Sequence, residues 1–509
     1  MHRFAATGSA VSTPARVSPV RTRLRPVAVD ADRLPTAIAH TDVLVVGGGV
    51  GGTAAALTLL RDHHRVVLTE PTGWIGGQLT SQGVPASDHA WSDEGLGVTT
   101  SYLQLRDRAR TASAEHFPAE PAAWHTVLSE ALHPYLEAGC LRLITEAVPE
   151  HVDARNGLVR SVTVRTPTRR LRVHARYVID ASELGDLLPL AGAPFVVGRE
   201  AGRGADGTGE PHNPHLRPDP RVQQHFSVIA AVGSAGGNRR PAECRLYDRF
   251  EPEYAAAAPE ASRPEAPPPG SWPPRDRLPQ TGAPGTEPEV VLLNQPEQVC
   301  HERVLIPSSG PTRAGMFEAA VRLAAEKVRG LARYRGLFLE PDVFETDGLA
   351  RYPYIREARR IRADLTITEQ DVTAASGPYA TRYPDSVGIG LGPIDVRHTD
   401  PIYLATRPFQ IPLRALLPRR MRNLLAGAKN IGTTQIANGC YRYHSVEWSI
   451  GEAAGHACAF ALRHHIEPRR MASDPTTFGV FASYLESHGV QRSWPEDRSR
   501  VEVADFGIA

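Results

Sequence analysis

The first long apolar segment of the chain, residues 43–46, is continuous rather than alternating. Such a run is typical of a strand buried on both faces of a parallel sheet. A glycine-rich turn follows, and from Thr53 the chain is rich in Ala and Leu without an internal helix breaker. A second short apolar run, residues 66–68, comes just before Glu70. This order predicts a strand, a helix and a second strand of an α/β domain.

Two later stretches repeat the combination of a buried strand and a glycine turn. Residues 177–179 predict a strand that leads to Gly185, and residues 423–425 predict a strand that leads to Gly427. A helix is predicted from Val446, and one of its faces contains Val446, Ile450, Ala453, Ala454, Ala457 and Ala461. Because most of these side chains are small, the helix could approach a sheet or a ligand closely.

The glycine turn after the first strand matches the pattern G-x-G-x-x-G at Gly47, Gly49 and Gly52. Between a strand and a helix, these glycines allow a tight turn, close approach to a pyrophosphate and close packing of the helix on the strand. The N–H groups at the helix N-terminus then face the phosphates. Glu70 follows at roughly the 20-residue distance of an acid that binds ribose hydroxyls and repels a 2′-phosphate. The alternative, a surface glutamate, does not explain the intact motif, so the sequence predicts a dinucleotide site.

Two further glycine-rich segments lack the context that makes this motif informative. Gly202, Gly204 and Gly207 have the same spacing, but no apolar strand precedes them and prolines follow. Residues 387–393 end in a proline, which breaks the helix that the motif requires. The chain therefore carries one predicted dinucleotide site and no visible second one.

These segments together resemble the glutathione-reductase-type flavoproteins, and most closely a bacterial group of FAD-dependent oxidoreductases. The similarity covers about residues 41–495 and includes the segments GWIGGQLTSQGVP, YIREARRI, FQIPLRALLP, KNIG, YRYHSVEW and IGEAAG. It implies an α/β fold: a glutathione-reductase-type FAD-binding Rossmann-like domain with an inserted mixed α+β substrate domain. This chain departs from the group at Gly427-Ala428, where the group usually has Ala-Gly, and it lacks the group's proline within residues 87–91.

The resemblance implies a set of cofactor-binding residues around FAD. They are Gly47, Gly49, Val50, Gly51, Gly52, Glu70, Gly76, Gly77, Gln78, Thr80, Val148, Ala181, Ser182, Gly185, Gly427, Asn430 and Ile431. In this interpretation Glu70 binds the adenosine end, and the polar residues 78–82 after the Gly76-Gly77 pair meet the flavin. An ordinary polar loop after a strand is the alternative interpretation of that segment.

Four residues are candidates for catalysis: His89, Arg356, Tyr441 and His444. Neither histidine has a partner that the sequence reveals, and a single histidine is more often structural. The charges of residues 356–360 usually indicate a solvated segment, although in the resembling group this segment lies near the flavin. Ser445 is predicted to cap the helix that starts at Val446, and His444 before it could add positive charge or take a proton from the substrate.

Composition changes along the chain suggest its domain boundaries. Residues 1–37 lack periodicity and predict a disordered tail. Residues 38–198 and 417–465 are expected to form the FAD-binding domain, and residues 199–416 the substrate domain. A proline-rich surface insertion is expected at about residues 251–288, because proline excludes helix and central strand there. Residues 466–509 are expected to form a helical C-terminal extension.

Charge and cysteine content limit the range of partners. Lys and Arg number 57 against 56 Asp and Glu, which gives no electrostatic case for binding nucleic acid or a membrane. No segment approaches the roughly 18 apolar residues of a membrane-spanning helix. The five cysteines are widely spaced without a Cys-x-x-Cys pair, which favours neither a metal site nor a redox disulfide and suggests a reducing cytoplasm.

Several flavin reactions lose support because their residues are missing. Disulfide reduction needs a thiol pair, and a built-in NAD(P)H reductase needs a second nucleotide site. The remaining hypothesis is a dehydrogenase or oxidase that passes a hydride from a small organic substrate of specialised metabolism to FAD, with oxygen or another acceptor reoxidising it. A flavin-dependent monooxygenase or halogenase that uses external NAD(P)H is the alternative, and a non-catalytic FAD-binding protein is a third. The substrate and the oligomeric state stay open.

Overall fold

The computed structural model describes residues 34–85, 96–113, 119–202, 209–234, 277–278, 290–293, 300–301, 305–310, 312, 314–334, 337–398 and 401–503. His89 lies outside these residues. So does the proline-rich insertion, apart from β10 (Arg277–Leu278). Most of the predicted N-terminal tail lies outside them too, and its last residues belong to the strand β1 (Thr36–Val46).

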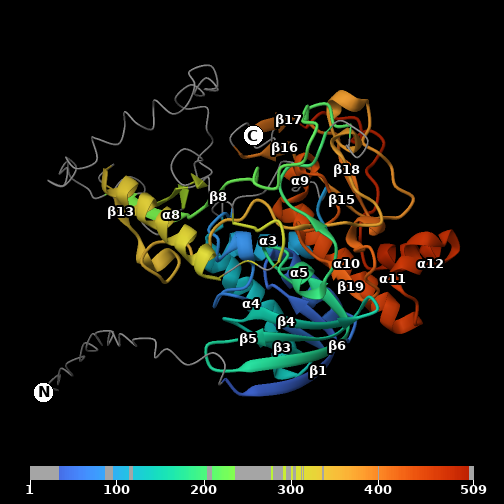
Figure 1. Cartoon of the computed structure of the whole chain (residues 1–509), viewed down its shortest axis with the longest axis horizontal. Coiled ribbons are helices and arrows are strands. Elements are labelled where there is room, and N and C mark those ends of the chain that lie inside the picture. The colour runs from blue at the N-terminus through green and yellow to red at the C-terminus, as the bar shows by residue number, and fades with distance from the viewer. Residues whose placement is uncertain are drawn as a thin grey trace, which may run out of the picture.

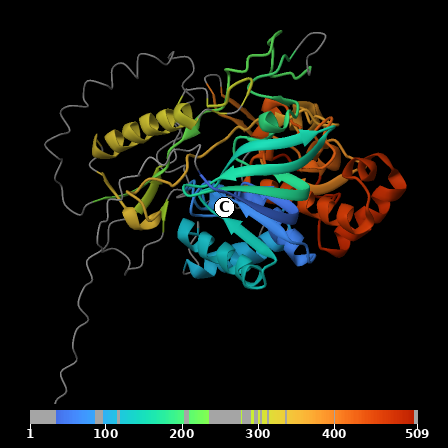
Figure 2. The same cartoon turned by 60° about the horizontal axis from the view of Figure 1, so that its bottom comes forward.

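A seven-stranded sheet forms the centre of the larger body, and β1 lies in its middle (Figures 1 and 2). β1 pairs in parallel with β2 (Val66–Thr69) on one side and with β6 (Arg170–Asp180) on the other. β3 (Leu141–Ile144) extends the sheet beyond β2, and β19 (Leu424–Ala426) pairs in parallel with β6. The four residues 43–46 are at most 1% exposed, so the predicted buried parallel strand of an α/β, Rossmann-like domain is confirmed.

An antiparallel hairpin completes this sheet. β4 (Val148–Arg155) pairs with β5 (Leu158–Arg165), and β5 pairs with the first half of β6. Asn156 and Gly157 join the two strands with φ of 53° and 76°. Positive φ at both positions of a two-residue loop matches the twist of the strands, and asparagine followed by glycine is the pair that adopts it most readily.

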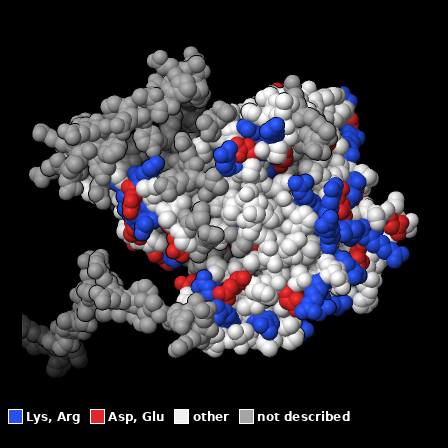
Figure 3. All heavy atoms as spheres, in the orientation of Figure 1, with Lys and Arg blue, Asp and Glu red and all other residues white. Residues whose placement is uncertain are grey.

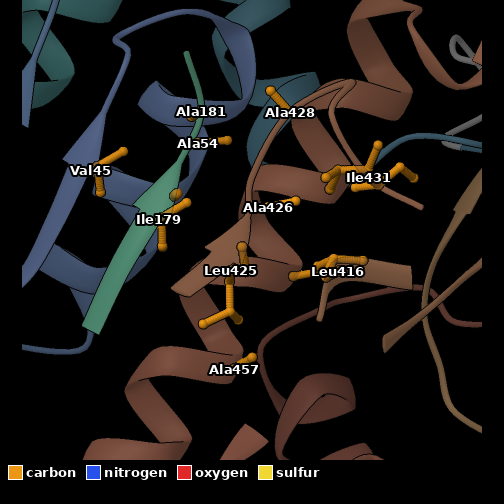
Figure 4. Close-up of a cluster of buried hydrophobic side chains, with 14 of the residues drawn as sticks. Val45, Ala54, Ile179, Ala181, Leu416, Leu425, Ala426, Ala428, Ile431 and Ala457 are labelled. Atoms are coloured by element: carbon orange, nitrogen blue, oxygen red, sulfur yellow. The ribbon is translucent and has the colours of Figure 1, made fainter. Parts of the chain in front are cut away.

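Two long helices pack against each other on this sheet. α1 (Val50–Arg61) follows β1, and α10 (His444–His464) comes from the far end of the chain. The close-up of the core shows side chains from the strands and both helices in one cluster, including Val45, Ile179, Leu425, Ala54 and Ala457 (Figure 4). α3 (Thr100–Ala112), α4 (Pro121–Glu137) and the short α5 (Leu187–Ala191) are further helices of the described residues between β2 and residue 195.

Both long helices begin earlier than the side-chain pattern suggests. α1 starts at Val50 instead of Thr53, because the Thr53 N–H already donates to the Gly49 carbonyl at 2.9 Å. α10 starts at His444 with Tyr443 as its N-cap, because the Glu447 N–H donates to the Tyr443 carbonyl at 2.7 Å. The prediction that Ser445 caps this helix is therefore wrong: Ser445 lies inside the first turn.

A smaller sheet lies to one side of the main body, with α8 beside it (Figure 1). Its strands follow the order β10, β11 (Val290–Leu293), β9 (Ala230–Ser234) and β13 (Leu337–Leu339). Side chains of α8 (Ala314–Tyr334) and of this sheet share a separate apolar cluster that includes Val232, Ala324 and Val328.

The remaining described strands form two-stranded pairs. The strand pairs are β7 (Phe195–Val196) with β14 (Arg360–Ile361), β8 (Phe226–Ser227) with β12 (Cys300–His301), β15 (Ser386–Gly390) with β18 (Phe409–Pro412), and β16 (Ile394–Val396) with β17 (Ile402–Leu404). Three further helices lie in the last part of the chain: α9 (Gln435–Tyr441), α11 (Pro468–Ser473) and α12 (Pro475–Ser487). The glycine-rich residues 386–390 form β15 and lead to no helix, as the proline at residue 393 predicts.

The surface carries basic and acidic side chains together. On the face in Figure 3 both signs are interspersed, in keeping with the near-equal numbers in the sequence. Within the described ranges, no helix is both long and apolar enough to cross a membrane.

The packing of α1 on α10 gives a testable expectation. A Cβ at Gly451 would overlap the Gly51 carbonyl oxygen, so Gly451→Ala should force the helices apart and destabilise the protein by about 1–3 kcal/mol. Gly479 in α12 has nothing within 4 Å of its Cβ position, and Gly479→Ala should stabilise by up to about 1 kcal/mol. Urea unfolding of both variants checks this, and equal stability of Gly451→Ala and the wild type would contradict it.

Candidate functional site

The carboxyl ends of the parallel strands meet at one edge of the sheet. Val46 at the end of β1 pairs with Thr69 of β2 and with Asp180 of β6. The chain turns there through Gly47, whose φ is 101° and whose Cβ would overlap the Ala181 carbonyl. Only glycine fits both conditions, so the first glycine of the motif is a steric requirement of the turn.

The start of α1 offers bare backbone to a ligand. Its N-cap is Gly49, without a side-chain hydrogen bond. The glycine-rich stretch comes close to it: Gly76 donates its N–H to the Gly48 carbonyl at 2.7 Å, and a Cβ on Gly77 would lie 2.8 Å from the Gly49 Cα and 3.3 Å from the Val50 nitrogen. An uncapped helix N-terminus between two glycine backbones is suited to a phosphate group.

Glu70 lies directly beside this turn and is 3% exposed. Its Oε2 accepts the Gly48 N–H at 3.1 Å, and its Oε1 accepts the Thr72 N–H at 2.9 Å and the Thr72 hydroxyl at 2.7 Å. Burial raises the pKa of Glu70 to about 8, although the hydrogen bonds from Thr72 oppose this rise. The Glu70 carbonyl accepts the Ala147 N–H at 2.9 Å, which brings Val148 at the start of β4 to the same edge.

The segment after β6 is held by its own side chains. The Ser182 hydroxyl donates to Asp180 Oδ1 at 2.6 Å and accepts the Asp186 N–H at 2.7 Å. Gly185 has φ of 65°, and a Cβ there would lie 2.9 Å from the Arg359 carbonyl oxygen. Ala181 and Ser182 thus follow the strand end in a fixed turn.

The loop after β19 is fixed to the same strand. Gly427 donates its N–H to the Asp180 carbonyl at 2.9 Å, and the Asn430 amide donates to that carbonyl at 2.9 Å. Ile431 is fully buried. Gly427 and Asn430 therefore connect the third glycine segment to the end of β6.

A buried charge cluster connects four segments at this edge. Lys429 is 0% exposed, forms an ion pair with Glu183, and lies with its Nζ 3.6 Å from Glu447 Oε2. Glu447 also accepts a hydrogen bond from the Gln78 amide at 2.6 Å. Burial lowers the pKa of Lys429, but the two carboxylates outweigh burial and the pKa is raised. Burial raises the pKa of Glu447 against the opposing charge of Lys429.

Glu183 faces the glycine backbones of the edge. A Cβ on Gly49 would lie 2.7 Å from Glu183 Oε1, and one on Gly77 would lie 3.0 Å from it. Sequence reasoning missed Glu183, Lys429 and Glu447 as site residues. Two of them are within the segments that carry the family resemblance, but the pairing of Lys429 with Glu183 spans 246 positions and leaves no pattern in the sequence.

In the polar residues 78–82 after Gly77, some side-chain atoms form hydrogen bonds within the protein and others do not. The Thr80 hydroxyl donates to the Ile75 carbonyl at 2.6 Å and so stabilises its own loop. Gln78 also donates to the Arg442 carbonyl at 3.2 Å. Gln82 Oε1 accepts the Ile355 N–H at 3.2 Å, whereas its Nε2 is buried without a partner in the described structure. Gln82 is therefore the residue of this run with a donor left for a ligand.

The first residue of α10, His444, is 3% exposed; neither ring nitrogen reaches full hydrogen-bond geometry with a described residue, although the ring makes a weaker polar contact with the Val84 backbone. Burial lowers the pKa of His444 to about 3, the Val84 backbone opposes the shift, and the charges of Arg442 and Lys429 add to it. The imidazole is therefore neutral at pH 7, and the positive charge considered for it from the sequence is not supported. Its capacity to accept a proton stays a prediction.

The other two described candidates for catalysis, Tyr441 and Arg356, differ in their hydrogen-bond partners. The Tyr441 hydroxyl donates to the Gln410 carbonyl at 2.6 Å, and its ring lies 4.6 Å from that of Phe409. This arrangement suits a structural tyrosine. Arg356 is buried with one side of its guanidinium bonded to neutral groups, the His225 carbonyl and the Ser227 hydroxyl.

Comparison with known proteins gives a family match and several distant structural likenesses. A family model described as FAD dependent oxidoreductase matches residues 42–478. L-proline dehydrogenase from P. horikoshii is 18% identical over 33% of this chain and 26% of its own, with a TM-score of 0.20. A myxobacterial FAD-dependent halogenase is 17% identical over 40% of this chain and 46% of its own, with a TM-score of 0.25.

A geranylgeranyl bacteriochlorophyll reductase-like protein from Thermoplasma acidophilum is 10% identical over 90% of this chain and 85% of its own, with a TM-score of 0.36. The chain spans less than half of the dehydrogenase and of the halogenase. At these identities and scores, none of the three structures bears on the reaction of this chain.

The charge cluster gives a second testable expectation. Lys429→Met leaves two buried carboxyl groups without their cation, which should cost about 3–5 kcal/mol of stability. Burial already raises the pKa of Glu447 against the charge of Lys429, so without Lys429 it would hold its proton still more strongly in the folded than in the unfolded protein, and the loss should grow as the pH is raised. Adding Glu183→Gln should recover part of it. Urea unfolding between about pH 6 and 9 checks this, because buried carboxyl groups of this kind have pKa values near neutrality.

The other lysine, Lys327, provides the matched control because it is exposed on α8. Lys327→Met should change the stability by no more than about 0.5 kcal/mol. A Lys429→Met variant as stable as Lys327→Met at every pH would show that the cluster is not a stabilising one.

Proposed function

The chain belongs to the FAD dependent oxidoreductase family, and from this premise we propose that it dehydrogenates a small organic substrate. When bound, FAD supplies the hydride acceptor, which oxygen or another acceptor reoxidises. The protein's own part is to bind and orient the cofactor and the substrate and to receive the proton that the oxidised group releases. We assign described residues to each of these three tasks below.

The residues at the sheet edge fit FAD. The Gly49 and Gly77 backbones beside the uncapped start of α1 suit the pyrophosphate. The buried carboxyl group of Glu70 suits the ribose hydroxyls, from which its oxygens can accept hydrogen bonds. We include in the proposal a glutathione-reductase-type arrangement, in which the antiparallel hairpin β4–β5 and the late strand β19 both join β6.

The proposal for the reacting end rests on one observation: buried polar atoms without a full hydrogen bond occur both in the glycine-rich stretch and at the start of α10. They are Gln82 Nε2 and the ring nitrogens of His444, whose ring contacts the Val84 backbone two positions after Gln82. Gln78 connects the two segments by its hydrogen bonds to Glu447 and the Arg442 carbonyl. Buried polar groups are normally satisfied, so unsatisfied ones at one place indicate a ligand.

The chemistry at this point follows from two properties of α10. Its N-cap has no side-chain hydrogen bond, and the N–H groups of its first turn carry roughly half a positive elementary charge, which favours negative charge beside them. The neutral imidazole of His444 has a lone pair for the proton of an O–H or N–H group, but its pKa of about 3 makes it a weak base, so this role requires a negative charge of the bound ligands beside the ring to raise that pKa. We therefore assign His444 as the proton acceptor.

Cofactor binding has a direct test. The purified protein should be yellow and release one non-covalent FAD per chain on denaturation. Gly49→Val should give a colourless protein, because the added side chain fills the gap between the motif and Gly77. Gly73→Val is the control, since its Cβ would meet only Arg351 Nη1, at 3.7 Å. Full FAD occupancy in Gly49→Val, or release of FMN or NAD, would refute the assignment.

The reaction class is tested by anaerobic reduction. A pool of metabolites should contain a compound that bleaches the flavin without NAD(P)H, and bleaching only with NAD(P)H would instead support a monooxygenase. With the active compound, His444→Ala should keep FAD but slow the reduction by about 10²- to 10⁴-fold. His464→Ala, exposed in the last turn of the same helix, should reduce at the wild-type rate. An unchanged rate in His444→Ala would return that residue to a structural role.

A further inference from the structure

Arg356 is a buried cation without a carboxylate among the residues that the structure describes. It is 4% exposed. Its Nη1 donates to the His225 carbonyl at 2.9 Å and to the Ser227 hydroxyl at 2.8 Å, and its guanidinium lies 4.4 Å from the centre of the Tyr354 ring. A buried charge is normally paired, because neutral partners replace only part of the hydration that it loses.

The two neighbouring arginines of the same segment are buried as well, and each forms an ion pair with at least one carboxylate. Arg359 pairs with Asp186 at 3.4 Å, and Arg360 pairs with Glu200 and Glu357, both at 2.7 Å. Three arginines within five positions are thus all buried, and Arg356 differs from the other two in lacking an acid.

The geometry of the Arg356 guanidinium limits what it can bind. Nη1 is used by the two neutral acceptors, and no described residue accepts a hydrogen bond from Nε or Nη2. These two groups lie along one edge of a planar fork, and their parallel N–H bonds match the two oxygens of a carboxylate. A phosphate can also place two oxygens on this edge, whereas a spherical anion uses it less fully.

This arginine is connected to the proposed reacting end through its neighbours. The Ile355 N–H donates to Gln82, the residue with the unpartnered amide. The Tyr354 hydroxyl, whose ring lies under the guanidinium, accepts a hydrogen bond from Arg442 Nη1 at 2.7 Å. Arg442 in turn lies two positions before His444.

We propose that Arg356 binds a carboxylate of the substrate, so that the molecule oxidised here is an organic acid. This rests on the proposed function, because it takes the region of Gln82 and His444 to be the substrate site. The carboxylate pairs with the Nε and Nη2 edge and directs the rest of the molecule towards the start of α10. A substrate without an acid group would leave the buried charge of Arg356 uncompensated.

The test uses the FAD-loaded protein and matched pairs of probes: acetate with acetamide, and benzoate with benzamide. Binding is measured by isothermal calorimetry and by the change in the visible spectrum of the flavin. The wild type should bind at least one carboxylate about 10- to 100-fold more tightly than its amide. Arg356→Met should abolish that preference, and Arg356→Lys should keep part of it because the charge remains without the planar fork.

Arg362→Met is the matched control, since Arg362 is exposed on the same segment, and it should retain the wild-type preference. The proposal is overturned if no carboxylate is preferred over its amide in the wild type, or if Arg356→Met keeps the preference. Its failure is distinguishable from failure of the proposed function. A protein that needs NAD(P)H for flavin reduction can still show calorimetric carboxylate binding that depends on Arg356, and an anaerobic dehydrogenase can lack it.

Discussion

The close approach of three backbones at Gly51 is the constraint on which the site depends. A Cβ on Gly51 would overlap the Gly427 carbonyl, and a Cβ on Gly451 would overlap the Gly51 carbonyl. Because no side chain separates these segments, the start of α1, the turn after β19 and the first turns of α10 share one small volume. Lys429 can then reach Glu183 and Glu447 together, and Gln78 can bridge to α10.

The parts of this arrangement that the sequence predicts are local or come from family resemblance. The strand, turn and helix at residues 43–61 follow from a continuous apolar run and a glycine motif, and the α/β class follows from them. The FAD cofactor and membership of the FAD dependent oxidoreductase family are confirmed by the family match. The more specific reaction, the cytoplasmic location, the domain boundaries and the individual roles of the site residues stay predictions.

The parts that the sequence does not predict are decided by packing between distant segments. Ser445 has a side chain typical of an N-cap, yet the hydrogen bond from the Glu447 N–H to the Tyr443 carbonyl starts the helix before it. In a peptide His444 would still carry a positive charge in part of the molecules at pH 7, and its burial, with the charges of Arg442 and Lys429, lowers the pKa to about 3. In the run of charges at residues 356–360, the sequence cannot tell which arginine lacks an acid, because Asp186 and Glu200 come from other parts of the fold.

The late position of β19 and α10 in the chain also has a consequence for how the protein acquires its fold. β6 pairs with β19 across 246 positions, as in Val178 with Leu424, and α1 can pack on α10 only after almost the whole chain has been synthesised. Contacts so distant in sequence are slow to form, since the loop between them must close first. During synthesis the apolar surface of α1 that packs on α10 therefore stays exposed to solvent. Exposed apolar surface of this kind binds chaperones and promotes aggregation.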